Sequence, residues 1–411
     1  MSEFFNVMPS GEAHELLFRS LSVRTRAEKV PTAGASGRVL AKDIYSPEDL
    51  PAFARSSMDG FSVRASDTFG ASEGMPAYFE VVGEVPMGSG PSVGLAAGQA
   101  ARAYTGGMLA GGADAVVMVE NTQAVDERTI EVNRPVAPGE NVIQVGEDVR
   151  RGDVVIPAGR VLRPQDIGGL MALGIMEVSV AQKPRVAIVS TGDELVPPAG
   201  SPGPGQVRDI NTYTISALVE KAGGVPVPIA LVPDEYETQR LAAVEGLGRC
   251  DMLVFSAGSS VSARDMTARV LGSLGSPGVL VHGLAHKPGK PTIIAVVDGK
   301  PAIGLPGNPV SAAVVFGMIC RPAIYRLAGC TEPPRAPSLS ARLLRDIPSV
   351  AGREDHAQVR LVMEGADLCA APVFGKSNLI YTLVRSDGAV IVPLERGGLY
   401  AGETVTVFLH T

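Results

Sequence analysis

The chain reads LAHKPGKPTIIAVVDGKPAIGLPGNPVSA over residues 284–312, and this stretch predicts the fold around it. Lys287 and Lys290 alternate with prolines, which fix φ and cannot donate a backbone hydrogen bond, so this part predicts a stiff loop. The apolar runs TIIAVV and PAIGLP predict two buried strands. Asn308 then suits a helix N-cap and Pro309 suits the first helical turn. One element thus supplies a lysine loop, two strands and a capped helix.

The same stretch offers the groups that bind a compact oxyanion. A helix N-terminus carries free N–H groups and partial positive charge. Lys287 and Lys290 add two ammonium groups, and Ser311 adds a hydroxyl in the first helical turn. The alternative is a solvated basic turn before an ordinary capped helix, and the local spacing by itself leaves both interpretations open.

Composition limits the classes of protein to consider. A chain of 411 residues with 45% hydrophobic residues can hold two to four domains with sizeable cores. No apolar run approaches the roughly 20 residues of a membrane span, and the N-terminus lacks a basic and an apolar signal region. The net charge of −7, without a Lys/Arg block, argues against a nucleic-acid partner. We therefore expect a cytoplasmic protein that binds no membrane.

Four widely spaced cysteines favour buried thiols over disulfides or metal ligands: Cys250, Cys320, Cys330 and Cys369.

Changes in pattern predict four parts. Strands and helices alternate over residues 183–329, which predicts a doubly wound, mostly parallel α/β domain. A proline-rich linker leads into strand–turn repeats over 330–411, which predict a C-terminal β domain of barrel type. Turn-rich short strands predict a mostly β subdomain over 46–146. The flanking segments 1–45 and 147–182 then form a discontinuous N-terminal domain that links the parts.

Polar residues follow the predicted parallel strands where ligands bind in doubly wound sheets. The strand ends read STGDEL (190–195), PDE (233–235), SAGSS (256–260) and GLPGNP (304–309). Neither a GxxxxGK[ST] loop nor a GxGxxG fingerprint is present, which disfavours a standard NTPase or dinucleotide oxidoreductase.

Local patterns give several of these residues ordinary structural roles. Asn211 and Asp234 both stand where a helix N-cap is expected. Asp59 precedes a glycine in a predicted hairpin turn, Thr105 lies at a glycine-rich bend, and Asp148 suits turn capping.

Six motifs in one order carry a family resemblance. They are SSMDGFSVR (56–64), YTGG to VVMVE (104–120), GED (146–148), STGDEL (190–195), KPGKP (287–291) and GLPGNPVSA (304–312). Together they resemble the MoeA-like molybdenum-insertion family, which includes bacterial molybdopterin molybdenumtransferase and the E-domain of gephyrin. The resemblance implies a four-part homodimer that inserts molybdate into adenylylated molybdopterin, uses Mg²⁺ and releases AMP. It also implies contact with a molybdopterin adenylyltransferase and with cofactor-accepting enzymes.

The resemblance implies roles for particular residues. Those that match the family's oxyanion pocket are Lys287, Lys290, Pro291, Ser311, Arg353 and Ser377, and Thr105 matches a hydroxyl near the pterin. The acidic positions are Asp59, Asp148, Glu194, Asp234 and Asp265, of which we assign Asp59, Glu194, Asp234 and Asp265 to catalysis. Hard Mg²⁺ prefers carboxylate and phosphate oxygens, so we assign Asp234, Asp265 and Asp148 to the metal.

Two features depart from the family pattern. The usual Ser-Gly-Gly loop and Gly-Glu-x-Asp segment are replaced here by SAGSSVSARD, which keeps Asp265 and places Arg264 beside it. A cation at that position either contacts a phosphate or lowers metal affinity. His286 stands before the lysine loop where an apolar residue is common, and a packed neutral histidine is favoured over an anion contact.

Three other functions compete with molybdate insertion. Tungstate has nearly the same size and charge as molybdate, so the sequence does not separate the two. Adenylylation of the pterin uses a related α/β domain, but the flanking β regions argue against it. A non-catalytic scaffold on the same fold is the third alternative, and the altered loop at 258–264 leaves room for it.

Overall fold

The computed structural model describes residues 7–23, 25–257 and 261–410, apart from the side chains of residues 261–264. The chain forms two compact units. Unit 1 comprises Met1–Lys42, Ala158–Ile167 and Met176–Thr411, and unit 2 comprises Asp43–Pro157 and Gly168–Ile175. The division into four parts is finer than these two units and stays a prediction.

A six-stranded sheet forms the centre of the α/β domain in unit 1. Its strand order is β16 (Val225–Val232), β13 (Arg185–Thr191), β17 (Met252–Ala257), β21 (Lys300–Pro306), β20 (Ile293–Val297) and β18 (Pro277–His282). The first four strands are parallel, and β20 and β18 run antiparallel to their neighbours. The predicted doubly wound, mostly parallel sheet is confirmed.

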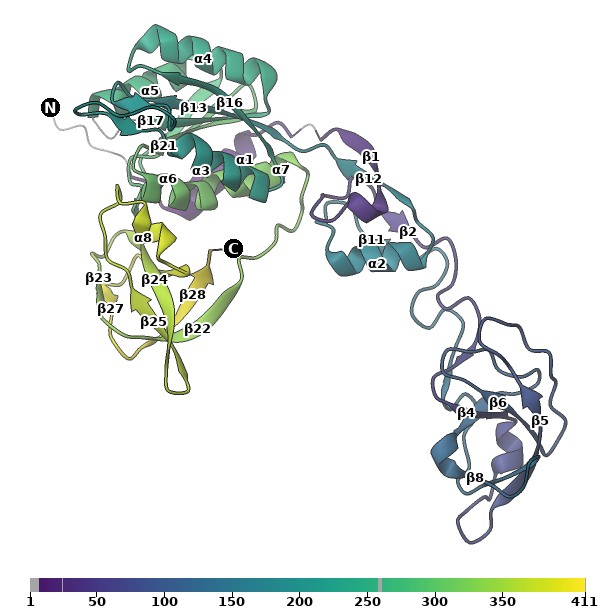
Figure 1. Ribbon diagram of the computed structural model, residues 1–411. Helices are drawn as coiled ribbons and strands as arrows, with labels where there is room; N and C mark the ends of the chain where they lie inside the picture. The colour runs from purple at the N-terminus through teal and green to yellow at the C-terminus, as the bar shows by residue number, and fades with distance from the viewer. Residues whose placement is uncertain (1–6, 24, 258–260, 411) are drawn as a thin grey trace. The chain divides into compact units, whose positions relative to one another are not determined.

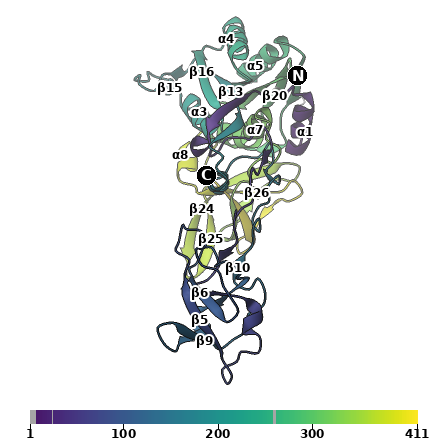
Figure 2. The same cartoon turned by 90° about the vertical axis from the view of Figure 1, so that its right-hand side faces the viewer.

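Helices cover both faces of this sheet (Figures 1 and 2). On one face lie α4 (Tyr236–Arg249) and α5 (Val261–Ser273), packed around the buried Phe255 and Leu271. On the other lie α1 (Ser10–Ser20), α3 (Asn211–Lys221), α6 (Pro309–Val315) and α7 (Arg321–Leu327), packed around a second apolar cluster. A short π-helical segment, Phe316–Cys320, joins α6 to α7. Apolar side chains on both sheet faces explain why its central strands are apolar throughout.

Two helix caps differ from prediction. Asp234 lies outside α4, because the helix begins at Tyr236 with Glu235 at the N-cap position. Asn211 lies inside α3, and Asp209 instead accepts a hydrogen bond from the Thr212 N–H at 3.2 Å. The Asn211 amide is buried and donates to Ser256 Oγ and to the Gly307 carbonyl, both at 2.8 Å. The Asn211 side chain therefore bonds to residues far away in sequence instead of capping the helix.

One helical stretch, Pro309–Leu327, is long and apolar enough to cross a membrane, which the sequence did not lead us to expect. Half of its 18-residue window is buried inside the protein. Val315, Phe316, Ile319 and Ile324 of this stretch pack in the α/β core. Its hydrophobicity is explained by this packing, as for the core helix of a globular domain.

A closed five-stranded barrel forms the C-terminal part of unit 1. Its strands are β24 (Glu354–Glu364), β25 (Asp367–Pro372), β22 (Ser338–Leu343), β28 (Thr404–Leu409) and β26 (Gly388–Val392), and β26 pairs back to β24. The predicted barrel-like domain is confirmed. A sixth strand, β19 (His286–Lys287), comes from the α/β domain and pairs with β24.

Unit 2 contains the predicted mostly β subdomain. Its sheet has the order β7 (Ala115–Met118), β4 (Gly60–Val63), β6 (Gln99–Ala103), β5 (Ala77–Glu84), β9 (Thr129–Val132) and β8 (Thr122–Ala124), around the buried Phe79. Smaller elements in the two units are β1 (Ala27–Pro31), β2 (Ile44–Tyr45), β3 (Arg55–Ser56), β10 (Val142–Ile143), β11 (Val154–Ile156), α2 (Pro164–Ala172), β12 (Glu177–Ala181), β14 (Leu195–Val196), β15 (Val207–Arg208), β23 (Ile347–Pro348), α8 (Tyr381–Val384) and β27 (Gly398–Leu399).

Candidate functional site

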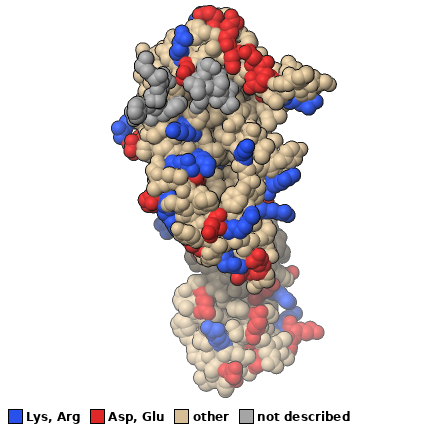
Figure 3. Space-filling view, turned by 90° about the vertical axis from the view of Figure 1, so that its left-hand side faces the viewer, with Lys and Arg blue, Asp and Glu red and all other residues tan. Residues whose placement is uncertain are grey.

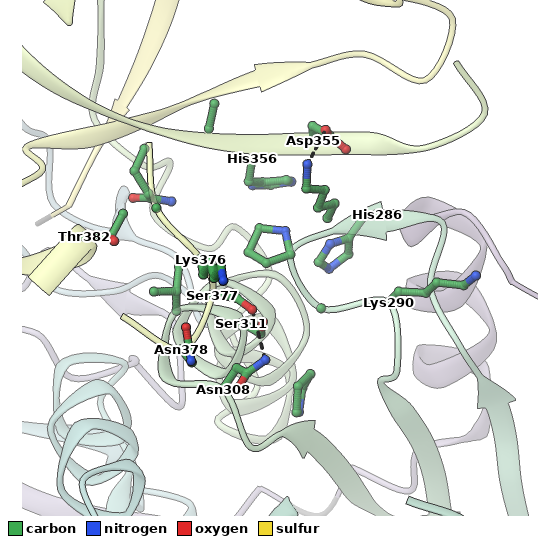
Figure 4. A pocket seen from close by; sticks show the side chains of 18 of the residues that line it. His286, Lys290, Asn308, Ser311, Asp355, His356, Lys376, Ser377, Asn378 and Thr382 are labelled. Carbon is green, nitrogen blue, oxygen red and sulfur yellow. Dashed lines mark hydrogen bonds and ion pairs between the residues drawn. The ribbon is translucent and has the colours of Figure 1, made fainter. Parts of the chain in front are cut away.

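A pocket of about 900 Å³ lies between the α/β domain and the barrel, and we call it the basic pocket (Figure 4). Its walls come from the lysine loop, the start of α6, the start of β24 and the segment after β25. Six predicted oxyanion residues line it together: Lys287, Lys290, Pro291, Ser311, Arg353 and Ser377. Figure 3 shows lysine and arginine side chains around a hollowed area on one face of the protein, with acidic side chains above them.

The lysine loop is joined directly to the barrel. His286 and Lys287 pair with β24 in parallel register, opposite Glu354 and Asp355. The Glu354 N–H also donates to the Ala285 carbonyl at 2.9 Å. The segment is the predicted non-helical loop, but its first residues belong to a sheet edge of another domain, which local sequence does not reveal.

Gly289 allows the loop to pass close to α6. It has φ +114, and a Cβ there would lie 2.4 Å from a Val315 methyl carbon and 2.7 Å from the His286 ring. Because both neighbours are packed side chains, only glycine fits this bend.

A buried carboxylate missed by the sequence analysis organises the basic pocket. Asp355 accepts two hydrogen bonds from Arg353, at 2.8 Å from Nε and 3.2 Å from Nη2. The Lys287 ammonium lies 3.7 Å from Asp355 Oδ2, the oxygen that also accepts from Arg353 Nη2, and the Asp355 side chain is only 7% exposed. The acidic residue in the Gly-Arg-Glu-Asp segment was the available signal. Asp355 fixes two cations from different domains and leaves Arg353 with unused N–H groups, because a guanidinium has five.

The start of α6 is held by the barrel. The Val310 N–H donates to the Ser377 carbonyl at 3.1 Å, so one of the helix N–H groups predicted to be free for an anion is already used. Asn308 occupies the predicted N-cap position, but its side chain makes no capping hydrogen bond. It donates instead to Ser377 Oγ at 3.0 Å. Ser311 is buried, and its hydroxyl has no hydrogen-bond partner among the described residues.

Lys290 is also one of the residues that line the pocket. Its carbonyl accepts from the Leu284 N–H at 2.9 Å. Figure 4 shows the side chain extended away from Ser311 and Ser377. Of the two loop lysines, Lys287 is therefore the one placed beside Arg353.

His286 is a packed neutral histidine in the pocket wall, as the sequence favoured. It is 1% exposed, and neither ring nitrogen has a hydrogen-bond partner within the described part of the chain. The pKa of His286 is lowered from 6.5 to about 4, mainly by burial and next by the His356 ring 5.6 Å away, against the opposing charges of Glu354 and Asp355. The imidazole is uncharged at neutral pH.

A second site candidate is the cluster of Asp193, Glu194 and Asp234 after β13 and β16, which we call the acidic edge. The Asp234 N–H donates to Asp193 Oδ1 at 3.1 Å, and Asp234 Oδ1 accepts from Gln239 at 3.3 Å. Burial raises the pKa of Asp234, and the charges of Asp193 and Glu194 raise it further. Carboxylates are thus crowded at these strand ends, although the described residues contain no group of three placed to hold a metal.

Asp265 lies half-buried on α5, and its side chain makes no hydrogen bond or ion pair with another described residue. The altered segment before it lies outside the described residues at 258–260, as do the side chains of 261–264. The predicted effect of Arg264 on the metal therefore stays a prediction.

The remaining predicted residues lie in unit 2. Asp59 Oδ1 accepts from the Thr105 N–H at 2.8 Å and from its hydroxyl at 2.9 Å, and these bonds lower the pKa of Asp59. Gly60 is required beside them, because a Cβ would lie 2.0 Å from the Val117 carbonyl oxygen. Asp148 is exposed in a turn, where its N–H donates to Leu50 O. The structure thus joins Asp59 to Thr105 by two hydrogen bonds.

Comparison with known families covers almost the whole chain. Residues 8–174 match the MoeA N-terminal region (domain I and II), residues 187–326 match a probable molybdopterin binding domain, and residues 340–409 match the MoeA C-terminal region (domain IV). The chain belongs to the MoeA family.

Individual relatives agree with this assignment. A molybdopterin molybdenumtransferase from Nostoc is 32% identical, with 95% of this chain and 90% of the relative covered. One from Haemophilus influenzae is 33% identical over 96% and 97% of the two chains. The crystal structure of the molybdopterin biosynthesis MoeA protein from Pyrococcus horikoshii has a TM-score of 0.84 at 32% identity, and covers 98% of this MoeA-family chain and 100% of that structure. The multidomain MoeA fold expected from the six motifs is confirmed.

Proposed function

We propose that this MoeA-family chain inserts molybdate into adenylylated molybdopterin and releases AMP in a Mg²⁺-dependent reaction. The relatives named molybdopterin molybdenumtransferase support a transferase of molybdenum-cofactor synthesis. One observation carries the finer proposal: six residues separated by up to 90 positions in sequence line a single basic pocket. Oxyanions are held by such sets of cations and hydroxyl groups.

The chain's own residues bind and orient the oxyanion. Arg353 presents its unused N–H groups, and Lys287 adds a point charge 3.7 Å from the same Asp355 carboxylate. The hydroxyls of Ser311 and Ser377 complete the set at the start of α6. Hydrogen bonds from charged donors are about twice as strong as neutral ones, so Arg353 and Lys287 contribute more than the two serines.

The donor set fits a magnesium ion at the acidic edge. Mg²⁺ is held by one or two carboxylates together with substrate phosphates, which does not require a cage of three protein ligands. The pKa of Asp234 is raised first by burial and then by the charges of Asp193 and Glu194, and a cation would offset these charges. We assign Asp234 and Asp265 to the metal and Glu194 to the catalytic acids. For Asp148 and Asp59 of unit 2, the metal role and the catalytic role rest on the family resemblance. When bound, Mg²⁺ neutralises charge on the phosphates and makes AMP a better leaving group.

The proposed assembly is a cytoplasmic homodimer with the active cleft between subunits. Thr105, fixed by Asp59, places a hydroxyl for the pterin. A molybdopterin adenylyltransferase supplies the adenylylated substrate, and cofactor-accepting enzymes take the product.

Insertion of tungstate is the second candidate, because the basic pocket recognises charge and tetrahedral shape, which the two oxyanions share. A scaffold without catalysis is the third, and substitution of Asp265 separates it from an enzyme. An enzyme loses turnover in Asp265→Asn, whereas a scaffold keeps its partner binding.

The first test is AMP release by purified full-length chain with adenylylated molybdopterin, molybdate and Mg²⁺. We expect AMP release that needs molybdate and Mg²⁺ and is lost in Arg353→Ala. Absence of AMP release by the wild-type chain would overturn the proposal. Parallel assays with tungstate rank the two oxyanions.

A further inference from the structure

Asn308 makes a contact that its position in the helix does not explain. An Asn at an N-cap normally accepts hydrogen bonds from the first helical N–H groups. Here the Asn308 side chain makes no such bond and donates across the domain boundary to Ser377 Oγ at 3.0 Å. Departures from a local rule of this kind are typical of functional sites.

The contact determines where the Ser377 hydroxyl can point its proton. A hydroxyl has one donor hydrogen and two acceptor positions. The Asn308 N–H occupies an acceptor position, so the Ser377 hydrogen must point elsewhere. No hydrogen bond to another described residue has Ser377 Oγ as its donor. Figure 4 shows Asn308 and Ser377 beside Ser311 at the wall of the basic pocket.

The Ser377 main chain is fixed independently of its hydroxyl. The Val310 N–H holds the Ser377 carbonyl at 3.1 Å, so the residue stays docked on α6 when its side chain is truncated. The role of the hydroxyl can therefore be separated from the attachment of the barrel segment to the helix.

We propose that Asn308 is a positioning residue that acts through Ser377. By donating to Ser377 Oγ, Asn308 leaves the hydroxyl hydrogen free to donate to an oxyanion in the basic pocket. This inference rests on the proposed function of that pocket, and it assigns to Asn308 a role beyond starting α6. A side chain that can only accept at position 308 reverses the Ser377 hydrogen bond and turns its hydrogen away from the pocket.

The test is a double-substitution cycle on molybdate binding, measured by calorimetry with the full-length chain. The variants are Asn308→Asp, Ser377→Ala and the combination of the two. Asn308→Asp keeps the shape and a hydrogen bond to Ser377, but the carboxylate must accept that bond. The matched control is Gln206→Glu, which makes the same charge change at an exposed amide outside the pocket lining and keeps its acceptor for the Gly203 N–H.

We expect Ser377→Ala to weaken molybdate binding about tenfold, the effect of losing one hydrogen bond to an ion. Asn308→Asp should lower molybdate affinity by about tenfold more when Ser377 is present than in the Ser377→Ala background. In that background only the effect of the added charge remains. Gln206→Glu should stay within about twofold of wild type, because a distant exposed charge is screened.

The outcomes separate this inference from the proposed function. If the wild-type chain binds no molybdate, the proposed function fails. If the wild-type chain binds but Ser377→Ala has no effect, or Asn308→Asp costs the same in both backgrounds, Asn308 only attaches the barrel to α6 and the inference is overturned.

Discussion

The basic pocket and the acidic edge lie in the same unit, but the pocket pairs opposite charges and the edge brings like charges together. In the pocket, Arg353 and Lys287 both contact Asp355, so these cations have an internal counter-ion. At the edge, Asp234 lies beside Asp193 and Glu194, and the pKa of Asp234 is raised by burial and by these charges. The pocket is thus organised before an anion arrives, whereas the edge is balanced only when a cation binds.

Among these predictions, substitution of Arg353 should have the largest effect on folding stability. Arg353→Ala leaves the buried Asp355 with Lys287 alone, and loss of one partner of a buried ion pair costs about 3 kcal/mol of folding stability. Urea denaturation measures the cost. The control is Arg353→Ala with Asp355→Asn, which should recover much of the stability because no buried charge remains. Equal stability of Arg353→Ala and wild type would show that Asp355 needs no internal counter-ion.

The pocket wall should carry an acid sensitivity that the edge lacks. Because the pKa of His286 falls from 6.5 to about 4 on folding, the unfolded chain binds more protons between these values, and stability falls as the pH falls. We expect the contribution of His286 to lower the free energy of unfolding by about 2 kcal/mol when the pH falls from 7 to 5. His286→Leu should remove this part of the pH dependence. An unchanged pH profile in that variant would mean that His286 titrates normally in the folded chain.

Substitution of Ser311 should weaken anion binding in the pocket with little effect on folding stability. Its hydroxyl has no partner among the described residues, so Ser311→Ala should change folding stability by less than about 0.5 kcal/mol. Molybdate affinity should fall about tenfold by calorimetry, because one donor to the anion is lost. Ser311→Thr, which restores the hydroxyl, serves as the rescue. A large loss of stability in Ser311→Ala would identify a packing role instead.

The smallest expected effect on molybdate binding is at the acidic edge. Asp234→Asn keeps an oxygen for Gln239 and removes one of the crowded charges, so it should stabilise the chain by about 0.5 kcal/mol at pH 7. Half-maximal AMP release should then require more Mg²⁺, while molybdate affinity stays the same. Destabilisation by this substitution would contradict the crowding of charge that distinguishes the edge from the pocket.

Much of the fold could be predicted because its signals are local. The apolar runs of β13, β17, β20 and β21 are continuous, as expected for strands buried on both faces. The order of motifs pointed to six residues that the structure gathers in one pocket. Asp355 was missed because its importance depends on Lys287, 68 positions away in sequence. Asn211, Asp234 and Asn308 carry good capping side chains, but other contacts engage these side chains.

The sequence by itself determined the order of strands and helices, the family, and the residue types that can hold an oxyanion, because periodicity and motif spacing are properties of the chain. Only the tertiary structure decided that β19 joins the barrel, that Asp355 neutralises Lys287 and Arg353, and that Asn308 donates to Ser377. These contacts join residues far apart in sequence. Their energies depend on burial and distance, which a linear pattern does not contain.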